Sequence, residues 1–352
     1  MMRRGSQGFV LVVVLAMLVT LSLLAGTVAL VTQRLRDDYL LQQRMLQDEV
    51  DMASTRATVV YMLLTQRMTF GGLTVDERVV LSADERQSAR SEGDVISFMP
   101  VGNEIALDGS AYRGVGGVDF ALQDDRGLVA VNWAAPAVLQ GLVRQGDSEE
   151  PIETLRNLLL DYQDPDDLYR LNSAEAEDYQ RDGLPPPSNR TLETPLELRR
   201  VKGWTEALGF LSDRELVGTA TTTRSAQINV NTAPARVLAS LPGVDMAMAR
   251  RVVAARALVP FIQLSAFYQL LGTIPADEDA LSLYPLPSGT LTLWGRGGGA
   301  VRVLHWTLTP LDDGGRPWRE DYEFNLPQVD DDAGAPAREP AAAVFAEPAA
   351  AP

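Results

Sequence analysis

Residues 9–31 form an uninterrupted run of 23 residues without a formal charge, rich in valine and leucine. As an α-helix with a rise of 1.5 Å per residue, this run would reach about 35 Å, which spans the hydrocarbon core of a bilayer. Arg3 and Arg4 precede the run, whereas Arg34 and Arg36 behind it are followed at once by two aspartates. This charge asymmetry favours a cytoplasmic N-terminus. We therefore expect a single membrane crossing, with the globular part of the chain outside the cytoplasm.

The helical pattern continues beyond this run. Apolar residues recur at steps of 3, 4 and 7 along one face of an amphipathic helix. Gly71 and Gly72 then provide a stop. We predict one stem helix from about residue 10 to about residue 68, and the alternative is a membrane anchor followed by a separate helix. The predicted face consists of Leu35, Tyr39, Leu46, Val50, Ala53, Ala57, Val60 and Leu64.

Composition narrows the chemistry that the rest of the chain can carry. With 31 Lys plus Arg against 47 Asp plus Glu, the formal charge is −16, which disfavours nucleic acid as a partner because phosphate binding needs a basic face. Cysteine is absent, so disulfides, thiol nucleophiles and thiolate metal sites are excluded. The single histidine, His305, lies in a strand pattern and is predicted to be a satisfied sheet residue. We expect no enzyme, and we expect any bound metal to be a hard ion held by carboxylates.

Strand patterns occur in two separate stretches. In the first, apolar and polar residues alternate, an Asp-Asp-Arg-Gly turn follows, and a short apolar run comes next, which predicts a hairpin. Strand patterns then disappear until residue 290, where a second series begins that contains a glycine-rich turn. The predicted strands are 118–123, 128–131, 290–294 and 301–308, with Trp318, Tyr322 and Phe324 marking a last one.

We interpret the two stretches as halves of one sheet domain, 69–135 and 286–327, with a mainly helical insertion at 136–285. The alternative is two domains in sequence. The final residues, 328–352, contain three consecutive aspartates and then mostly alanine and proline, which predicts a disordered tail. Phe345 within this tail is either a short docking element or part of a solvated tail; we favour the solvated tail and assign the residue no function.

Between residues 161 and 182 the chain carries eight acidic residues against two arginines. Repulsion at this density disfavours a compact fold unless the segment is solvated or a cation neutralises it. Asp164, Asp166 and Glu175 match positions 1, 3 and 12 of an EF-hand loop, but Leu168 and Tyr169 stand where a ligand and the turn glycine belong. The segment is therefore not an EF-hand. An irregular calcium loop and a solvated acidic loop both remain open.

Two short helices joined by a Pro-Gly turn are predicted within 231–270, and they resemble the helix-hairpin-helix of DNA-binding proteins, including membrane-anchored competence receptors. In those hairpins a second glycine follows the turn, so that backbone amides approach a phosphate. Asp245 replaces that glycine here and repels phosphate. Arg250, Arg251 and Arg256 are either phosphate contacts or the solvated face of a helix. The alternatives are an extracytoplasmic DNA receptor and a packing module.

The residues just before the apolar run discriminate further. Its length argues against a cleaved secretory signal, whose apolar region is typically about 7–15 residues, and leaves a plain signal anchor or a prepilin-type segment. A short basic leader ends in Gly8 and is followed directly by Phe9 and the apolar helix. This arrangement resembles the prepilin peptidase site of type IV pilins and type II secretion pseudopilins. The resemblance implies a leader at 1–8 that is cleaved after Gly8, and methylation of the new N-terminal Phe9.

Val13 occupies the position where most members of that family carry a glutamate. A buried carboxylate there can pair with the amino terminus of a neighbouring subunit, which offsets the cost of placing charge in lipid. Among pseudopilins, the large minor subunit called general secretion pathway protein K characteristically lacks this glutamate. The chain resembles the protein K family from its leader to its last strand. The similar segments of the insertion are 160–167, 174–179, 187–189 and 197–203.

The resemblance implies an α+β fold, in which a pilin-like long N-terminal helix packs on an antiparallel sheet that carries a large, mainly helical inserted domain. The helix is implied to be transmembrane over 9–31 and outside the membrane over 32–68. Members of the family bind calcium in the insertion, and the hairpin is a packing module there. The ligands carried over onto this chain are Asp164, Asp166, Glu175 and Asp178, with Asp161 and Asp167 as further candidates.

The implied function is that of a minor pseudopilin at the tip of the type II secretion pseudopilus, where it starts assembly together with minor pseudopilins I and J. Prepilin peptidase and the inner-membrane assembly platform are further implied partners. The implied location is the inner membrane, with a cytoplasmic N-terminus and a periplasmic globular domain. A role in a related type IV pilus system and the DNA receptor described above are the alternatives.

Overall fold

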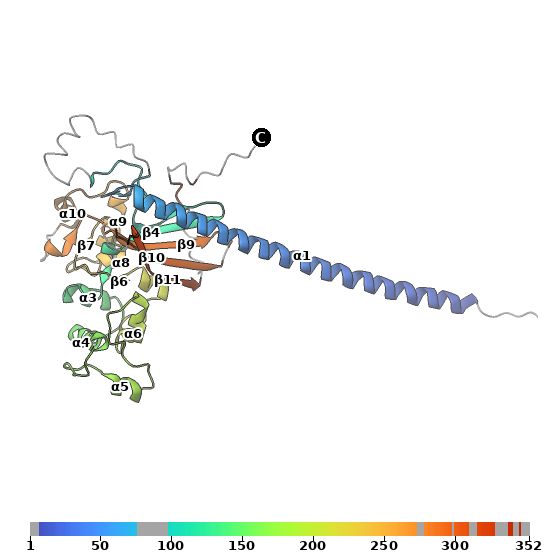
Figure 1. The fold of residues 1–352 in the computed structure, drawn as a ribbon, viewed down its shortest axis with the longest axis horizontal. Helices are drawn as coiled ribbons and strands as arrows, with labels where there is room; N and C mark the ends of the chain where they lie inside the picture. Colours follow the sequence, from blue (N-terminus) through green and yellow to red (C-terminus); the bar gives the residue numbers. More distant parts are fainter. Residues whose placement is uncertain are drawn as a thin grey trace, which may run out of the picture. The chain divides into compact units, whose positions relative to one another are not determined.

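The computed structural model describes residues 7–75, 98–272, 278–297, 299–309, 315–327, 337–340 and 345. The chain divides into two units, Met1–Asp51 and Met52–Pro352. The first unit contains most of the long helix α1 (Figure 1). The second unit contains the end of that helix and all the other described helices and strands.

Helix α1, Gln7–Thr65, is continuous for 59 residues. This confirms the prediction of one stem helix and rules out an anchor followed by a separate helix. Its most apolar stretch has a mean hydropathy of 2.8 and no buried residues. By length and composition, therefore, this helix is able to cross a membrane.

The glycine pair that was expected to stop α1 has another role, because the helix already ends at Thr65. Gly71 lies in the turn between two short strands, β1, Met68–Thr69, and β2, Gly72–Leu73. Gly72 has a φ of +135°, and a Cβ there would lie 2.1 Å from the carbonyl oxygen of Ile105. Only glycine fits this position, so the pair forms a tight turn against a neighbouring backbone.

The end of α1 packs on the sheet through a face that differs from the predicted one. Met52, Thr55 and Val59 are buried, at steps of three and four residues. Ala53 and Ala57, which belong to the predicted face, are exposed. The predicted face is therefore wrong for this part of the helix. Small and apolar side chains occupy more than one face here, and periodicity alone does not tell which face meets the sheet.

A five-stranded antiparallel sheet has the strand order β11-β10-β9-β4-β3. Strands β9, β10 and β11, which are the last three along the chain, confirm the strands predicted from residue 290 onward. In the centre of the sheet, β4 pairs with β9, and Phe120 lies opposite Leu293. The strands are β3 Asp108–Arg113, β4 Val118–Asp124, β9 Ser288–Gly295, β10 Ala300–Leu308 and β11 Trp318–Pro327.

The hairpin predicted after β4 is wrong. The hairpin partner of β4 is β3, whereas β5, Val129–Ala130, pairs in parallel with β6, Ala220–Thr221, outside the sheet. The acidic turn that was expected to close the hairpin is the 3₁₀ turn η2, Asp125–Gly127, and its first residue is buried. Because this turn leads the chain away from the sheet, the apolar run behind it enters the helical region instead of returning.

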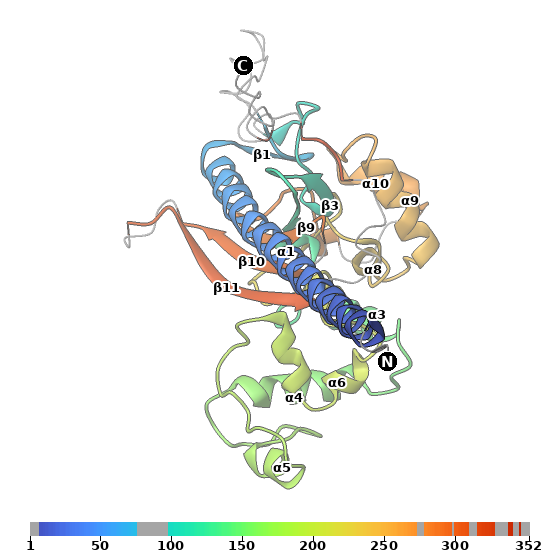
Figure 2. The same cartoon turned by 90° about the vertical axis from the view of Figure 1, so that its right-hand side faces the viewer.

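The helical region joins two strands that are neighbours in one sheet, since β4 ends at Asp124 and β9 begins at Ser288. This topology confirms the α+β fold class with a mainly helical segment between strands; the boundaries 136 and 285 remain a prediction. In both views α4, α5 and α6 gather in one group and α8, α9 and α10 in another (Figure 1, Figure 2). The helical elements are α3 Pro136–Val143, α4 Ile152–Gln163, α5 Ala176–Arg181, η3 Pro195–Arg200, α6 Trp204–Ala207, α7 Asp213–Val217, α8 Ala235–Leu238, α9 Met246–Arg256, α10 Leu264–Leu271 and η4 Glu278–Ala280, and β7 Ile228–Asn229 pairs in parallel with β8 Leu281–Ser282.

Three apolar clusters lie in the described part of this second unit, and the two larger ones form most of its core. One lies between the end of α1 and the sheet and includes Phe120 and Trp306. The other lies mainly within the inserted segment, is joined by Phe70, and includes Tyr179, Trp204 and Phe267, which are almost fully buried. Burial of side chains of this size is the main favourable contribution to folding. The insertion therefore has an apolar core of its own.

The C-terminal tail is not free throughout. Arg338 forms a parallel bridge with Tyr112 of β3, and the ring of Phe345 is 9% exposed and stacks on Phe120. The prediction of a solvated tail is wrong for these two residues, because a single aromatic side chain gains enough from burial to anchor a segment rich in alanine and proline. The rest of the predicted tail, 328–336, 341–344 and 346–352, lies outside the described residues.

Candidate metal centre

The acidic segment forms a loop between α4 and α5. Helix α4 has an apolar face, which includes Leu158 and Tyr162, and Asp161 lies on the same buried side. Asp164 follows at the end of α4, and Glu175 immediately precedes α5. The rings of Tyr162 and Tyr179 lie 5.9 Å apart, and their packing joins the end of α4 to α5. The fold thus brings carboxylates from two helix ends together.

Asp161, Asp164 and Glu175 each place a carboxylate oxygen within 4.8 Å of the other two. Glu175 is 2% exposed. Among the described residues, neither of its carboxylate oxygens has a hydrogen-bond partner, and neither does buried Oδ1 of Asp164. Leaving a charged carboxylate buried and unpaired is costly, so this arrangement calls for a proton or a cation.

The charges of the cluster act on one another. Burial, together with repulsion from Asp161 and Asp164, raises the pKa of Glu175 to about 7. Burial alone would raise the pKa of Asp161 as well, but hydrogen bonds from Arg170 and Ser173 hold it below its usual range. Near neutral pH the cluster therefore contains a charged Asp161 and a partly protonated Glu175.

Arg170 neutralises one side of the cluster. Its guanidinium group contacts the carboxylates of both Asp161 and Asp164, and its backbone N–H donates to Oδ2 of Asp161 at 2.9 Å. These hydrogen bonds raise the pKa of Arg170 above its usual range. Glu175 receives no such partner among the described residues. The arginine is 39% exposed and is thus able to move away if a metal ion takes its place.

Three of the other acidic candidates lie outside this cluster. Asp166 is exposed, and its Oδ1 accepts a hydrogen bond from the backbone N–H of Leu168 at 2.9 Å. Asp178 accepts from the backbone N–H of Glu175 at 3.2 Å and pairs with Arg181, so it orders the start of α5. Asp167 is exposed. Of the four first-choice ligands, the structure brings together Asp164 and Glu175 and adds the second-choice Asp161.

The donor set suits calcium. All the clustered groups are carboxylate oxygens, which hard cations prefer, and calcium accepts irregular geometry with water filling the remaining positions. The family resemblance gives Asp161 only as a further candidate, yet this residue lies in α4, three residues before Asp164. An i, i+3 pair of aspartates at the end of an amphipathic helix is the signal that would have indicated it.

In the hairpin at 231–270, Arg250 and Arg251 lie exposed on α9, as a solvated helix face requires, whereas Arg256 does not. Gly243 has a φ of +79°, and Asp245 caps α9 by accepting a hydrogen bond from the N–H of Met248 at 2.7 Å. Arg256 is buried, donates to the carbonyls of Val230 and Ala233, and lies 3.5 Å from Asp108. Arg256 is therefore neither a phosphate contact nor part of a solvated face, and nothing in the described structure favours the DNA receptor.

A second buried polar group joins the insertion to the sheet, and it was predicted only as a turn. Asp124 is fully buried, and four groups donate to its carboxylate. Burial raises the pKa of Asp124 to about 6 despite these bonds. The donors are the N–H groups of Arg126 and Leu286 and the side chains of Asn229 and Thr232. Arg126 and Leu286 lie near the two ends of the segment between β4 and β9, so Asp124 holds these two ends together.

The ring of His305 is paired through both of its nitrogens, which confirms the prediction that His305 is a satisfied sheet residue.

Comparison with known proteins gives two matches to family models. Residues 121–209 and residues 228–283 each match a model described as "Type II secretion system (T2SS), protein K". The first match contains the acidic cluster, and the second contains the hairpin. No curated protein sequence matches the chain.

Among solved structures, the chain is similar to one in "The Crystal Structure of the GspK-GspI-GspJ complex from enterotoxigenic Escherichia coli Type 2 Secretion System". The sequence identity is 15% and the TM-score is 0.47, over 83% of this chain and 100% of that chain. The likeness to protein K comes from the two model matches, which follow one another in sequence and fall within or beside the segment inserted between β4 and β9. Over these two segments, 121–209 and 228–283, the chain is similar to protein K of the type II secretion system.

Proposed function

We propose that this chain is a minor pseudopilin that takes the tip position of the type II secretion pseudopilus and starts its assembly with minor pseudopilins I and J. The role is structural and serves protein export across the outer membrane. The observation that carries the proposal is the pair of protein K matches, which cover the bulky insertion of a chain that begins with a long apolar helix. A bulky insertion fits poorly into every subunit of a close-packed filament and is accommodated most easily once, at its end.

The proposal includes maturation and topology. Prepilin peptidase removes residues 1–8, cutting after Gly8, and the new N-terminal Phe9 is methylated. The apolar part of α1 then lies in the inner membrane, with its N-terminus on the cytoplasmic side beside the assembly platform. Val13 agrees with a tip position, since a first subunit has no predecessor whose amino terminus would need a glutamate.

Calcium binding by Asp161, Asp164 and Glu175 is part of the proposal. Its support is the buried, unpaired Glu175 carboxylate beside two further carboxylates. When bound, the ion would supply positive charge that links the end of α4 to the start of α5. In a chain without cysteine, such a link would stabilise a module that has no disulfide to do so.

The proposal is tested first at the N-terminus. The full chain is expressed with prepilin peptidase, and intact mass and N-terminal peptides are measured by mass spectrometry. We expect a chain that begins at methylated Phe9, and we expect Gly8→Leu to retain residues 1–8. A wild-type chain that keeps its leader, while a known pseudopilin in the same cells is processed, would contradict the proposal.

Assembly is tested separately by co-purification of the processed full chain with minor pseudopilins I and J in detergent. A stable complex of the three is expected. Correct processing without any association would retain the membrane topology but reject the tip role.

A further inference from the structure

The two edges of the five-stranded sheet are protected in different ways. An edge strand presents unpaired N–H and C=O groups, which are a template for another strand. On one edge, β11 carries Arg319, Glu320, Asp321 and Glu323, and charges of this kind discourage further pairing. On the other edge, the middle of β3 is Gly-Ser-Ala-Tyr and carries no charge. The β3 edge therefore needs some other form of cover.

The C-terminal tail supplies that cover. The N–H of Arg338 donates to the carbonyl of Ala111 at 2.9 Å, and the N–H of Arg113 donates to the carbonyl of Arg338 at 2.8 Å. These bonds make a parallel bridge between Tyr112 and Arg338. Glu339 adds an ion pair with Arg113 at 2.9 Å. A short piece of the tail thus lies on β3 as an added strand would.

A second anchor lies further along the tail. The ring of Phe345 stacks on Phe120 with centroids 5.2 Å apart, and the ring of Tyr112 also contacts Phe120, with centroids 5.9 Å apart. Phe345 belongs to the same apolar cluster as Met52 of α1. Main-chain pairing at an edge combined with a pocket for one side chain is the general mode by which sheets bind extended peptides.

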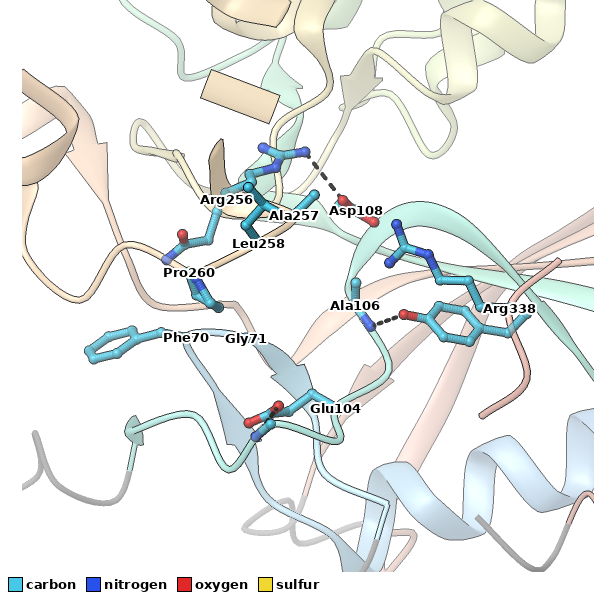
Figure 3. A pocket seen from close by; sticks show the side chains of 13 residues that line it. Phe70, Gly71, Glu104, Ala106, Asp108, Arg256, Ala257, Leu258, Pro260 and Arg338 are labelled. Carbon is cyan, nitrogen blue, oxygen red and sulfur yellow. Dashed lines mark hydrogen bonds and ion pairs between the residues drawn. The ribbon is translucent and has the colours of Figure 1, made fainter. Parts of the chain in front are cut away.

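The tail also closes a cavity. A cavity of about 180 Å³ lies between β3 and the end of the hairpin, and its lining includes Asp108, Arg256 and Arg338 (Figure 3). Arg338 lies across this cavity from Phe70, near the end where Asp108 pairs with Arg256 (Figure 3). Removal of the tail would therefore open both the strand edge and the cavity beside it.

We propose that the β3 edge and the aromatic socket made by Tyr112 and Phe120 form a strand-addition site, and that the tail segment carrying Arg338 and Phe345 is its occupant. The tail acts as a removable cap that any other extended segment must displace. At its described residues, 337–340 and 345, the tail is held by two backbone hydrogen bonds, one aromatic contact and an ion pair with half-exposed or more exposed partners, which is little compared with a sheet strand. Its attachment to the chain raises its local concentration, and this keeps the site filled.

The site is tested by exchange in trans. The chain is truncated after residue 336 and purified in detergent. It is then titrated into a fluorescent peptide of residues 335–347, and binding is measured by the fluorescence anisotropy of the peptide. We expect the truncated chain to bind the peptide and the intact chain not to bind it. Phe345→Ala in the peptide is expected to weaken binding by about tenfold, because it removes the buried ring. Equal binding to intact and truncated chains, or no binding to a truncated chain with an unchanged melting curve, would overturn the proposal.

A second measurement keeps the proposal testable if the truncated chain does not fold. Since the chain has no cysteine, Arg113→Cys with Glu339→Cys creates a single pair of thiols across the bridge. We expect a disulfide to form within the chain under mild oxidation, because Arg113 and Glu339 each directly follow a residue of the bridge between Tyr112 and Arg338 and their side chains meet in an ion pair. The matched control combines Arg113→Cys with Arg250→Cys, an exposed position on α9, and is expected to stay reduced. Equal crosslinking of both pairs would show that the tail does not occupy the β3 edge.

Discussion

Nε2 of His305 lies 2.9 Å from Oδ2 of Asp125, and Nδ1 of the same ring lies 2.8 Å from Oδ2 of Asp321. Asp125 also accepts hydrogen bonds from Ser288 at 2.6 Å and from Thr221 at 3.1 Å. The ring of His305 thus connects the last two sheet strands with the turn where the insertion leaves the sheet. This relationship makes the only histidine of the chain a joint between the two parts of the fold.

The joint predicts a dependence of stability on pH. Burial alone would lower the pKa of His305, but its hydrogen bonds to Asp125 and Asp321 raise it to about 9, above its ordinary value of 6.5. The stabilisation is therefore complete below pH 6.5 and is lost as the pH rises through 9, with a size on the order of 3 kcal/mol. Urea unfolding at pH 6, 8 and 10 should show this loss.

The control for that prediction is His305→Gln, which keeps hydrogen-bonding groups but cannot carry the charge. Its free energy of unfolding should be lower than that of the wild type at pH 6 and should change less between pH 6 and 10. A variant whose stability falls as steeply as that of the wild type would show that other groups cause the effect.

Removal of the clustered carboxylates should abolish the response to calcium. For the wild type at a calcium concentration of 100 times the dissociation constant, the free energy of unfolding should rise by about 2.7 kcal/mol, since the ion binds only the folded state. Asp164→Ala combined with Glu175→Ala should show no such rise. Asp166→Ala is the matched control, because it removes a carboxylate of the same loop that lies outside the cluster. Thermal unfolding with and without calcium measures all three, and an unchanged shift in the double variant would refute the assignment.

Arg170 should compete with calcium. Its guanidinium group occupies the space beside Asp161 and Asp164, so a metal ion must displace it or bind against its charge. Arg170→Gln should raise calcium affinity by roughly tenfold while lowering stability in the absence of calcium. Isothermal titration calorimetry measures the affinity, and Arg181→Gln, on the exposed side of α5, is the control. An affinity that falls in the Arg170 variant would mean that the arginine positions the ligands instead of competing with the ion.

The helices and strands that could be predicted from the sequence are those with long, regular patterns of apolar residues. The continuous apolar run of α1 and the alternating residues of β4, β9 and β10 were found because each side chain repeats the same local preference. Phe120 and Leu293, for instance, were both assigned to strands that the sheet confirms, and the gap between them indicated that a segment is inserted. Patterns of this kind can be recognised in the sequence without knowledge of the tertiary structure.

The predictions that were wrong share a physical cause. Tertiary contacts decide whether a residue is buried or exposed where the local sequence allows both. Asp124 and Asp125 have the composition of an exposed turn, yet donors from distant segments make them the most deeply buried acids beside the sheet. The family resemblance places Asp166 before Asp161 as a ligand, but resemblance of a segment carries no information about which of its carboxylates is buried, and here it is Asp161. Phe345 was dismissed with its tail because composition averages over neighbours, whereas burial acts on a single ring.

The close approach of α1 to the sheet gives the last prediction. A Cβ at Gly114 would lie 2.6 Å from Cγ2 of Thr55, whose Oγ1 accepts a hydrogen bond from the N–H of Val115 at 2.9 Å. Gly114→Ala should lower the free energy of unfolding by about 1–3 kcal/mol, because buried Thr55 cannot rotate away without losing that bond. Gly218→Ala is the control, since its nearest atom would be at 3.5 Å.

Thr55→Ala alone should cost about 1 kcal/mol through the lost hydrogen bond. Combined with Gly114→Ala, it should destabilise the chain by less than the sum of the two single changes, because the smaller side chain makes room for the new methyl group. Urea unfolding of the four proteins measures this coupling. If the two changes in the free energy of unfolding simply add, the side chain of Thr55 does not limit the space at Gly114. The helix would then lie further from Gly114 than the 2.6 Å between an added Cβ and Cγ2 of Thr55 implies.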